Sequence, residues 1–167
     1  FNPTEKCSSY DSTISVIMEE ARIHQSRRLR AWMALIIPIP VMADESLTSL
    51  RDAFRIARND WADMINIKLM KAGGIYKALK INALAESYGI ECMTGSMIET
   101  KLGITAAAHF AASQPNITRY DFDAPLMLAE DIVEGGVIYE GRIIRFSIAN
   151  GLGIDKVRMD ERFMRKQ

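Results

Sequence analysis

The feature that most constrains this chain is a recurring alternation of short apolar runs with segments of helical spacing. The apolar runs cover residues 39–43, 64–69, 90–93 and 117–120, so their starts lie about 25 residues apart. The first three are each followed by a turn and then by apolar residues with helical spacing. Apolar strands that alternate with helices are typical of a parallel sheet covered by helices. We therefore expect an α/β fold with four parallel strands.

The helical segments between these runs have recognisable ends. Leu47, Leu50, Phe54 and Ala57 lie on one helical face, and Ser46 is a plausible N-terminal cap. A second helix is expected from about residue 75 to Gly89, after the Gly73-Gly74 turn, and a third over 98–113 before Pro115.

Outside this core the pattern changes. Residues 1–12 read as loop, and Ile14, Ile17, Met18 and Ala21 predict a helix to about Arg30. Residues 137–139 and 143–146 read as a β-hairpin, and the charged residues after Gly153 are expected to form a tail or a docking segment. We divide the chain into residues 1–38, an irregular or helical segment, 39–134, the strand–helix repeat, and 135–167, the hairpin and tail.

Composition excludes several classes of protein. The 167 residues are 49% hydrophobic and 25% charged, which fits one globular domain. The 21 basic and 21 acidic side chains cancel, which argues against binding to nucleic acid or a membrane surface, although Arg27–Arg30 form a short basic run. No apolar run reaches the length of a membrane span. Cys7 and Cys92 form no disulfide framework, so a cytoplasmic location is expected. Because the chain begins at Phe1, we expect it to be part of a longer protein.

Polar side chains gather where the apolar runs end, which is the edge of a parallel sheet where ligands bind. Asp121 and Asp123 are two residues apart, so on a strand they face one side and repel each other unless a metal or a substrate ammonium lies between them. Each position also has a structural alternative: an acid can cap a helix or form a turn, and a lysine can extend to solvent. His24 and His109 are read as structural. The candidate residues are Asp44, Glu45, Lys68, Ser96, Asp121 and Asp123.

The runs 40–46, 66–74 and 95–100 resemble the enolase superfamily, in its muconate-lactonizing subgroup. The segment Asp121-Phe122-Asp123-Ala124-Pro125 is similar to that of the dipeptide epimerases, including those acting on L-Ala-D/L-Glu. The resemblance covers about residues 39–153 and implies the C-terminal half of a (β/α)8 barrel, the TIM barrel, with a C-terminal β-hairpin.

The resemblance also implies a chemistry. Such enzymes remove a proton α to a carboxylate, with Mg²⁺ stabilising the enediolate and lysines acting as acid and base. By resemblance, Asp44 is a metal ligand with Glu45 beside it, and Lys68 is an acid/base lysine whose pKa a dication should lower. Asp121 and Asp123 match the pair that binds the dipeptide's α-ammonium, and Ser96 and Met97 line the same substrate site.

The sequence also departs from the family pattern. No K-x-K motif precedes Asp44, and no Glu-Gln-Pro strand end occurs; the acids Glu5, Asp11, Glu19 and Glu20 are not placed at any expected strand end. Three alternatives therefore stay open. In the first, the parent enzyme is a relative of muconate cycloisomerase or o-succinylbenzoate synthase. In the second, the chain is an inactive half barrel that serves in assembly. In the third, it binds nucleic acid through Arg27–Arg30. Because a half barrel exposes unpaired sheet edges, we expect a homo-oligomer.

Overall fold

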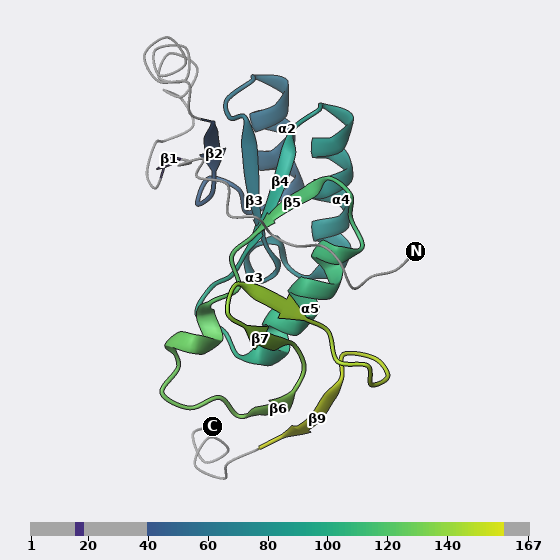
Figure 1. Ribbon diagram of the computed structural model, residues 1–167. Coiled ribbons are helices and arrows are strands. Elements are labelled where there is room, and N and C mark those ends of the chain that lie inside the picture. Colours follow the sequence, from purple (N-terminus) through teal and green to yellow (C-terminus); the bar gives the residue numbers. More distant parts are fainter. Residues whose placement is uncertain (1–15, 19–39, 159–167) are drawn as a thin grey trace, which may run out of the picture.

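A five-stranded parallel sheet forms the centre of the molecule. The computed structural model describes residues 16–18 and 40–158. Within them the sheet has the order β1-β2-β3-β4-β5, and each strand pairs in parallel with the next (Figure 1). The strands are β1 (Val16–Met18), β2 (Val41–Ala43), β3 (Met64–Lys68), β4 (Glu91–Gly95) and β5 (Ile117–Tyr120). The carboxyl ends of all five strands therefore lie at one edge of the sheet.

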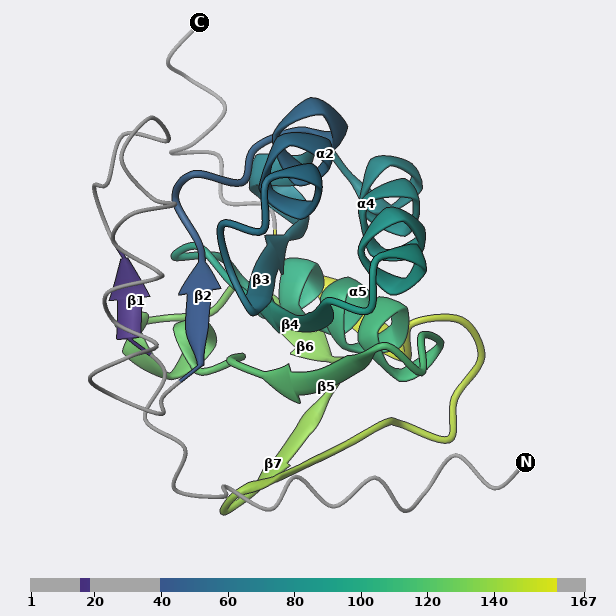
Figure 2. The ribbon, with the colours of Figure 1, turned by 90° about the horizontal axis from the view of Figure 1, so that it is seen from above.

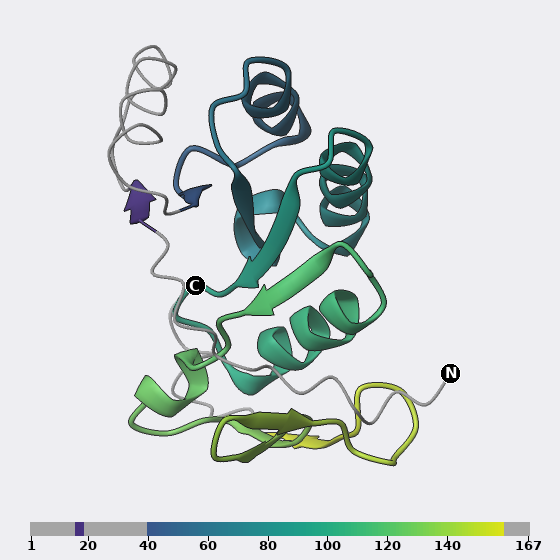
Figure 3. The same cartoon turned by 45° about the horizontal axis from the view of Figure 1, so that its top comes forward.

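Helices cover the outer face of this sheet, as Figure 2 and Figure 3 show. They are α2 (Leu50–Arg58), α4 (Ile75–Ser87) and α5 (Lys101–Ala112), with the one-turn α3 (Leu69–Ala72) directly after β3. Their apolar faces meet the outward side chains of the strands, including Ile65, Ile67, Cys92 and Ile117, in one continuous core. Strands in an arc with helices outside are the architecture of half a (β/α)8 barrel. The expected fold class is confirmed.

Turn chemistry explains where the helices start. Ser49, rather than the predicted Ser46, caps α2: its backbone is extended and its hydroxyl accepts a hydrogen bond from the Asp52 amide. The chain first turns after β2, where the Leu47 amide donates to the Asp44 carbonyl at 2.9 Å, so the helix begins later than its apolar spacing indicates. Gly73 ends α3 in the left-handed conformation, with φ of 81°.

The C-terminal part packs beneath α5 (Figure 1). After the short 3-10 helix η2 (Ala124–Met127), β6 (Val133–Gly135) pairs antiparallel with β9 (Ile154–Val157). The predicted hairpin is present as β7 (Ile138–Glu140) and β8 (Ile143–Arg145). Thr105 of α5 accepts a hydrogen bond from the Val137 amide at 3.1 Å, which joins the hairpin to the helix layer.

One expectation about secondary structure is wrong, and one open alternative is resolved. The helical spacing of Ile14, Ile17, Met18 and Ala21 predicts a helix, but Val16–Met18 form a strand because their backbone pairs with Val41–Ala43 of β2. After Gly153, where a tail and a docking segment were both expected, Ile154–Val157 dock on the fold by pairing with β6. In both segments the secondary structure is set by backbone pairing with a distant strand, and the periodicity of the side chains does not indicate such pairing. The division into three segments stays a prediction, and Cys7, His24 and Arg27–Arg30 lie outside the described residues.

Candidate functional site

The predicted residues lie at the carboxyl ends of four neighbouring strands. Asp44 and Glu45 come directly after β2, Lys68 is the last residue of β3, and Ser96 and Met97 follow β4. Asp121 follows β5, two residues before Asp123. Within the described residues, the structure brings these side chains into two groups.

The first group joins β2 to β3 by ion pairs. The Lys68 ammonium lies 3.1 Å from Asp44 Oδ1 and 3.2 Å from Glu45 Oε1. Asp44 is buried, with 5% of the residue exposed, whereas 46% of the Glu45 side chain is exposed. The structure therefore places the predicted metal ligands and the predicted proton-transfer lysine in direct contact.

Sequence reasoning missed two members of this group. The Lys71 ammonium, from α3, binds the Asp44 carbonyl at 2.9 Å and Asp44 Oδ1 at 3.0 Å, and it lies 3.3 Å from Glu45 Oε2. Asn66 is fully buried in β3, and its Nδ2 donates to Asp44 Oδ2 at 3.1 Å. Lys68 and Asn66 are two residues apart on one strand, so they share a face; that spacing could have revealed Asn66.

Gly95 makes room for this arrangement. It pairs with Lys68 across β3 and β4, and a Cβ atom at this position would lie 2.7 Å from Asn66 Oδ1. A side chain here would therefore displace the Asn66 amide from Asp44. Asn66 Oδ1 is buried and has no hydrogen-bond partner among the described residues.

The charges of this group compensate one another. Burial alone would raise the pKa of Asp44, but hydrogen bonds from Lys71 and Lys68 outweigh it and hold that pKa below its ordinary value. Burial alone would lower the pKa of Lys68, but hydrogen bonds and charge from Asp44 and Glu45 raise it. This direction is opposite to the one expected beside a dication, because here the lysine is paired with acids.

The second group is the pair of aspartates after β5. Burial, and then the charge of Asp123, raise the pKa of Asp121 above its ordinary value. The backbone between them is fixed from several elements: the Asp121 amide donates to the Thr94 carbonyl at 3.0 Å, and the Ser96 hydroxyl donates to the Asp121 carbonyl at 3.2 Å. The structure therefore holds two like charges close together.

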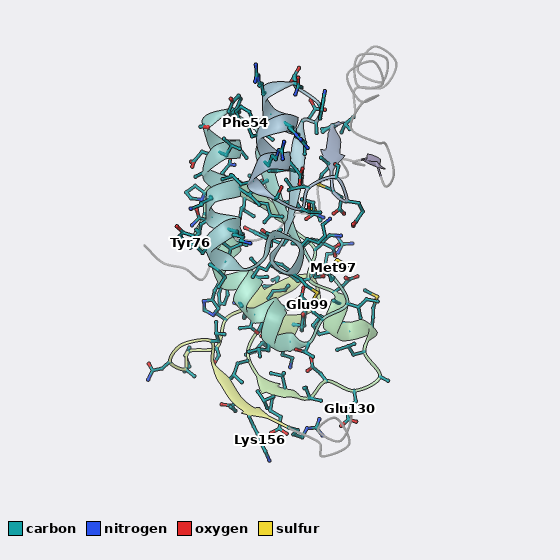
Figure 4. The ribbon with its side chains drawn as sticks, turned by 180° about the vertical axis from the view of Figure 1, so that it is seen from behind. Phe54, Tyr76, Met97, Glu99, Glu130 and Lys156 are labelled. Carbon is teal, nitrogen blue, oxygen red and sulfur yellow. The ribbon has the colours of Figure 1, made fainter. Side chains whose placement is uncertain are left out.

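The loop that follows β4 completes this edge. Met97 is partly exposed, with 37% of its surface accessible, and its amide donates to Glu99 Oε1 at 3.2 Å. Figure 4 labels both residues on the segment that leads into α5. The predicted structural role of His109 agrees with its ring contact to Phe146, 4.4 Å between centroids. Cys92 is buried, and burial raises the pKa of its thiol to about 12.

The donor set fits a hard divalent cation in part. Carboxylate oxygens are the ligands that Mg²⁺ prefers, and Asp44 and Glu45 supply them. Among residues 16–18 and 40–158, however, no three acidic, histidine or cysteine side chains cluster as a metal centre. The N-terminal acids Glu5, Asp11, Glu19 and Glu20 lie outside the described residues, so their placement stays a prediction.

The parallel sheet with its outer helices places the chain among the α/β barrel proteins. The cluster of acids and lysines at the carboxyl edge of the sheet is typical of an enzyme's active site. Comparison with known families identifies the family: the one described as enolase C-terminal domain-like matches residues 16–160. The chain belongs to this family. In the part of the chain that the structure describes, no helix has the length and apolar character needed to span a membrane.

Several relatives are dipeptide epimerases. The chain is 64% identical over 115 residues to the L-Ala-D/L-Glu epimerase of Bacillus subtilis, covering 69% of this chain and 31% of the relative. The dipeptide epimerase of Enterococcus faecalis, solved with Mg and the dipeptide L-Leu-L-Tyr, is similar with a TM-score of 0.75 and 45% identity, over 83% of this chain and 39% of that one.

A racemase with a different substrate is also similar. The N-succinyl Arg/Lys racemase structure from Bacillus cereus has a TM-score of 0.77 and 36% identity, covering 86% of this chain and 38% of that one. The chain spans about a third of the length of the curated relatives it matches. These relatives are isomerases.

Proposed function

We propose that this chain supplies the carboxyl-edge half of the active site of a dipeptide epimerase. The observation that carries the proposal is the contact between Lys68 and Asp44, 3.1 Å at the edge where the pair Asp121 and Asp123 also lies. One group offers a proton-transfer lysine beside carboxylates, and the other offers two anions. A dipeptide with a free amino terminus presents the charges that match both.

Each residue has a proposed role. Lys68 moves the proton at the α-carbon next to the substrate carboxylate, as positioned lysines do in general acid–base catalysis. Asp121 and Asp123 bind the α-ammonium, because two adjacent carboxylates are stabilised by a cation between them. Ser96 acts through the backbone of Asp121, and Met97 lines the loop beside the substrate.

We propose Mg²⁺ as the cofactor. Asp44 would hold it, with Glu45 beside it, and Glu19 is our candidate for a second carboxylate because it follows β1 as Asp44 follows the neighbouring β2. A bound Mg²⁺ supplies positive charge that stabilises negative charge developing on a substrate carboxylate. Asn66 and Lys71 orient the Asp44 carboxylate for this role. The similar structure from Enterococcus faecalis was solved with Mg.

The proposed chemistry is tested by following solvent exchange at the α-carbon. The chain is incubated with Mg²⁺ and L-Ala-L-Glu in D2O, and loss of the α-proton signal is followed by proton NMR. We expect exchange with the wild-type chain and at least about a hundredfold less with Lys68→Met, the usual scale for losing an acid–base group.

A matched control is Lys80→Met, since Lys80 lies on α4 with its ammonium 4.3 Å from the Tyr76 ring centroid. This variant should exchange like the wild type. If the wild-type chain shows no exchange above a protein-free sample, the chain does not act as an epimerase, and the inactive assembling half barrel is then the better account. If L-Ala-L-Glu and N-acetylated dipeptides exchange equally, the assigned substrate class is wrong.

A further inference from the structure

The segment Asp121–Asp123 is held by a residue far along the chain. The Tyr139 hydroxyl, from β7, donates to the Phe122 carbonyl at 2.7 Å. Phe122 is buried, with 5% of the residue exposed, and it lies between the two aspartates in sequence. Tyr139 therefore connects the C-terminal hairpin to the peptide unit that joins the two acids.

This bond completes a series of backbone contacts. The Asp121 carbonyl accepts from Ser96 at 3.2 Å, the Phe122 carbonyl accepts from Tyr139, and the Asp123 carbonyl accepts from the Leu126 amide at 2.8 Å. All three carbonyls of the segment are bonded, each from a different element. Two carboxylates that repel each other need such restraint to stay together without a cation.

The tyrosine suits this task. Burial, followed by the charges of Asp123 and Asp131, raises the pKa of Tyr139 to about 12. The hydroxyl therefore keeps its proton, and remains a donor, at any physiological pH. Lys68 and Asp44 also act on Asp121 by charge, the first lowering its pKa and the second raising it.

We infer that Tyr139 is a positioning residue, whose hydroxyl bond to the Phe122 carbonyl keeps Asp121 and Asp123 side by side as a preformed site for a cationic group. That the cation is a dipeptide ammonium rests on the proposed function; the positioning itself does not. The C-terminal hairpin thereby contributes to selection of the ligand, although it carries neither carboxylate.

The direct test is a carbon-13 NMR titration of the Asp121 carboxyl in the full chain. Tyr139→Phe removes only the hydroxyl, and Tyr88→Phe is the matched control, because Tyr88 is 46% exposed and ends α4 before β4 begins. We expect Asp121 to titrate above its ordinary range in the wild type and in Tyr88→Phe, and to shift down in Tyr139→Phe as the carboxylates separate.

An unchanged Asp121 titration in Tyr139→Phe overturns the inference, as does an ordinary titration in the wild type. Ser96→Ala removes the neighbouring hydrogen bond, to the Asp121 carbonyl, and is the second variant to titrate if Tyr139→Phe fails to fold. It should lower the pKa of Asp121 as well. An unchanged titration there counts against the inference.

A binding measurement separates this inference from the proposed function. Calorimetry compares L-Ala-L-Glu with N-acetyl-L-Ala-L-Glu, which lacks the ammonium. Tyr139→Phe should reduce the preference for the free amino terminus by about tenfold, the upper scale of one neutral hydrogen bond. Equal binding of both by the wild type, with the Asp121 shift intact, refutes the dipeptide assignment and leaves the role of Tyr139 standing.

Discussion

Asp44 and Asp121 follow strands of the same sheet at the same edge, but the groups around them affect their charges in opposite ways. Asp44 is buried against Lys68 and Lys71, at 3.1 and 3.0 Å, and these hydrogen bonds lower its pKa despite burial. Asp121 is buried in part beside Asp123, and its pKa is raised by burial and by that like charge. One acid is neutralised within the chain. The other lies beside a like charge, and we propose that it is held ready for a cation supplied by a ligand.

The difference lies in how each charge is balanced: Asp44 is paired with lysines of the chain, whereas Asp121 lies beside a like charge. A buried ion pair stabilises a fold only if its partners stay together, and removing one partner leaves an uncompensated charge. A pair of like charges weakens the fold, so its presence at a ligand-binding edge indicates a functional role. Each of the following changes alters one side of this comparison.

The largest effect on stability is expected from Asp44→Asn. This change leaves Lys68 and Lys71 without their shared buried partner and should reduce the free energy of unfolding by about 3 kcal/mol, measured by urea denaturation. Glu45→Gln is the matched control, because 46% of the Glu45 side chain is exposed, and it should change stability by less than about 1 kcal/mol. Equal losses of stability in the two variants would show that the burial of Asp44 does not determine how much it stabilises the fold.

A large effect on binding, with little loss of stability, is expected from the double variant Asp121→Asn, Asp123→Asn. Both anions that face the proposed ammonium lose their charge, so the affinity for L-Ala-L-Glu should fall by roughly a hundredfold, measured by calorimetry. Asp60→Asn, at an exposed turn after α2, is the control. Retained affinity would remove the Asp pair from the substrate site.

A smaller effect is expected on the pH dependence of stability. The pKa of Asp121 is higher in the folded chain than its ordinary value of 3.8, so ionisation disfavours the folded state as pH rises through that window. Asp121→Asn should therefore stabilise the chain at pH 7, by less than about 1 kcal/mol because Asp121 is only partly buried and water screens its charge. The gain should vanish below about pH 3.8. Urea denaturation at pH 7 and below pH 3.8 measures this gain in the free energy of unfolding. A larger gain in acid would contradict a raised pKa of Asp121 in the folded chain.

The core of the fold could be predicted from sequence because its signals are local. The apolar runs of β2 to β5 and the amphipathic spacing of α2 report burial directly, and the Gly-containing loop at Gly141 marks the β7–β8 hairpin. β1 and β9 gave no such signal. Both are short strands defined by backbone pairing with β2 and β6, and pairing partners are distant in sequence.

The site was predictable in its charged residues but not in their supports. Asp44, Lys68 and Asp121 stand at strand ends, where position alone suggests a ligand site. Lys71 reaches Asp44 from the turn after the strand, and Tyr139 reaches Phe122 from a hairpin 17 residues away. Such contacts depend on how elements pack, which no spacing in the sequence reveals.

We propose that the two groups act together as one metal-dependent dipeptide site. The most direct measurement is a calorimetric titration of the full chain with Mg²⁺, with and without L-Ala-L-Glu. We expect that the dipeptide strengthens Mg²⁺ binding in the wild type and that Asp44→Asn abolishes the effect. Absence of Mg²⁺ binding up to millimolar concentrations, with or without the dipeptide, would contradict it.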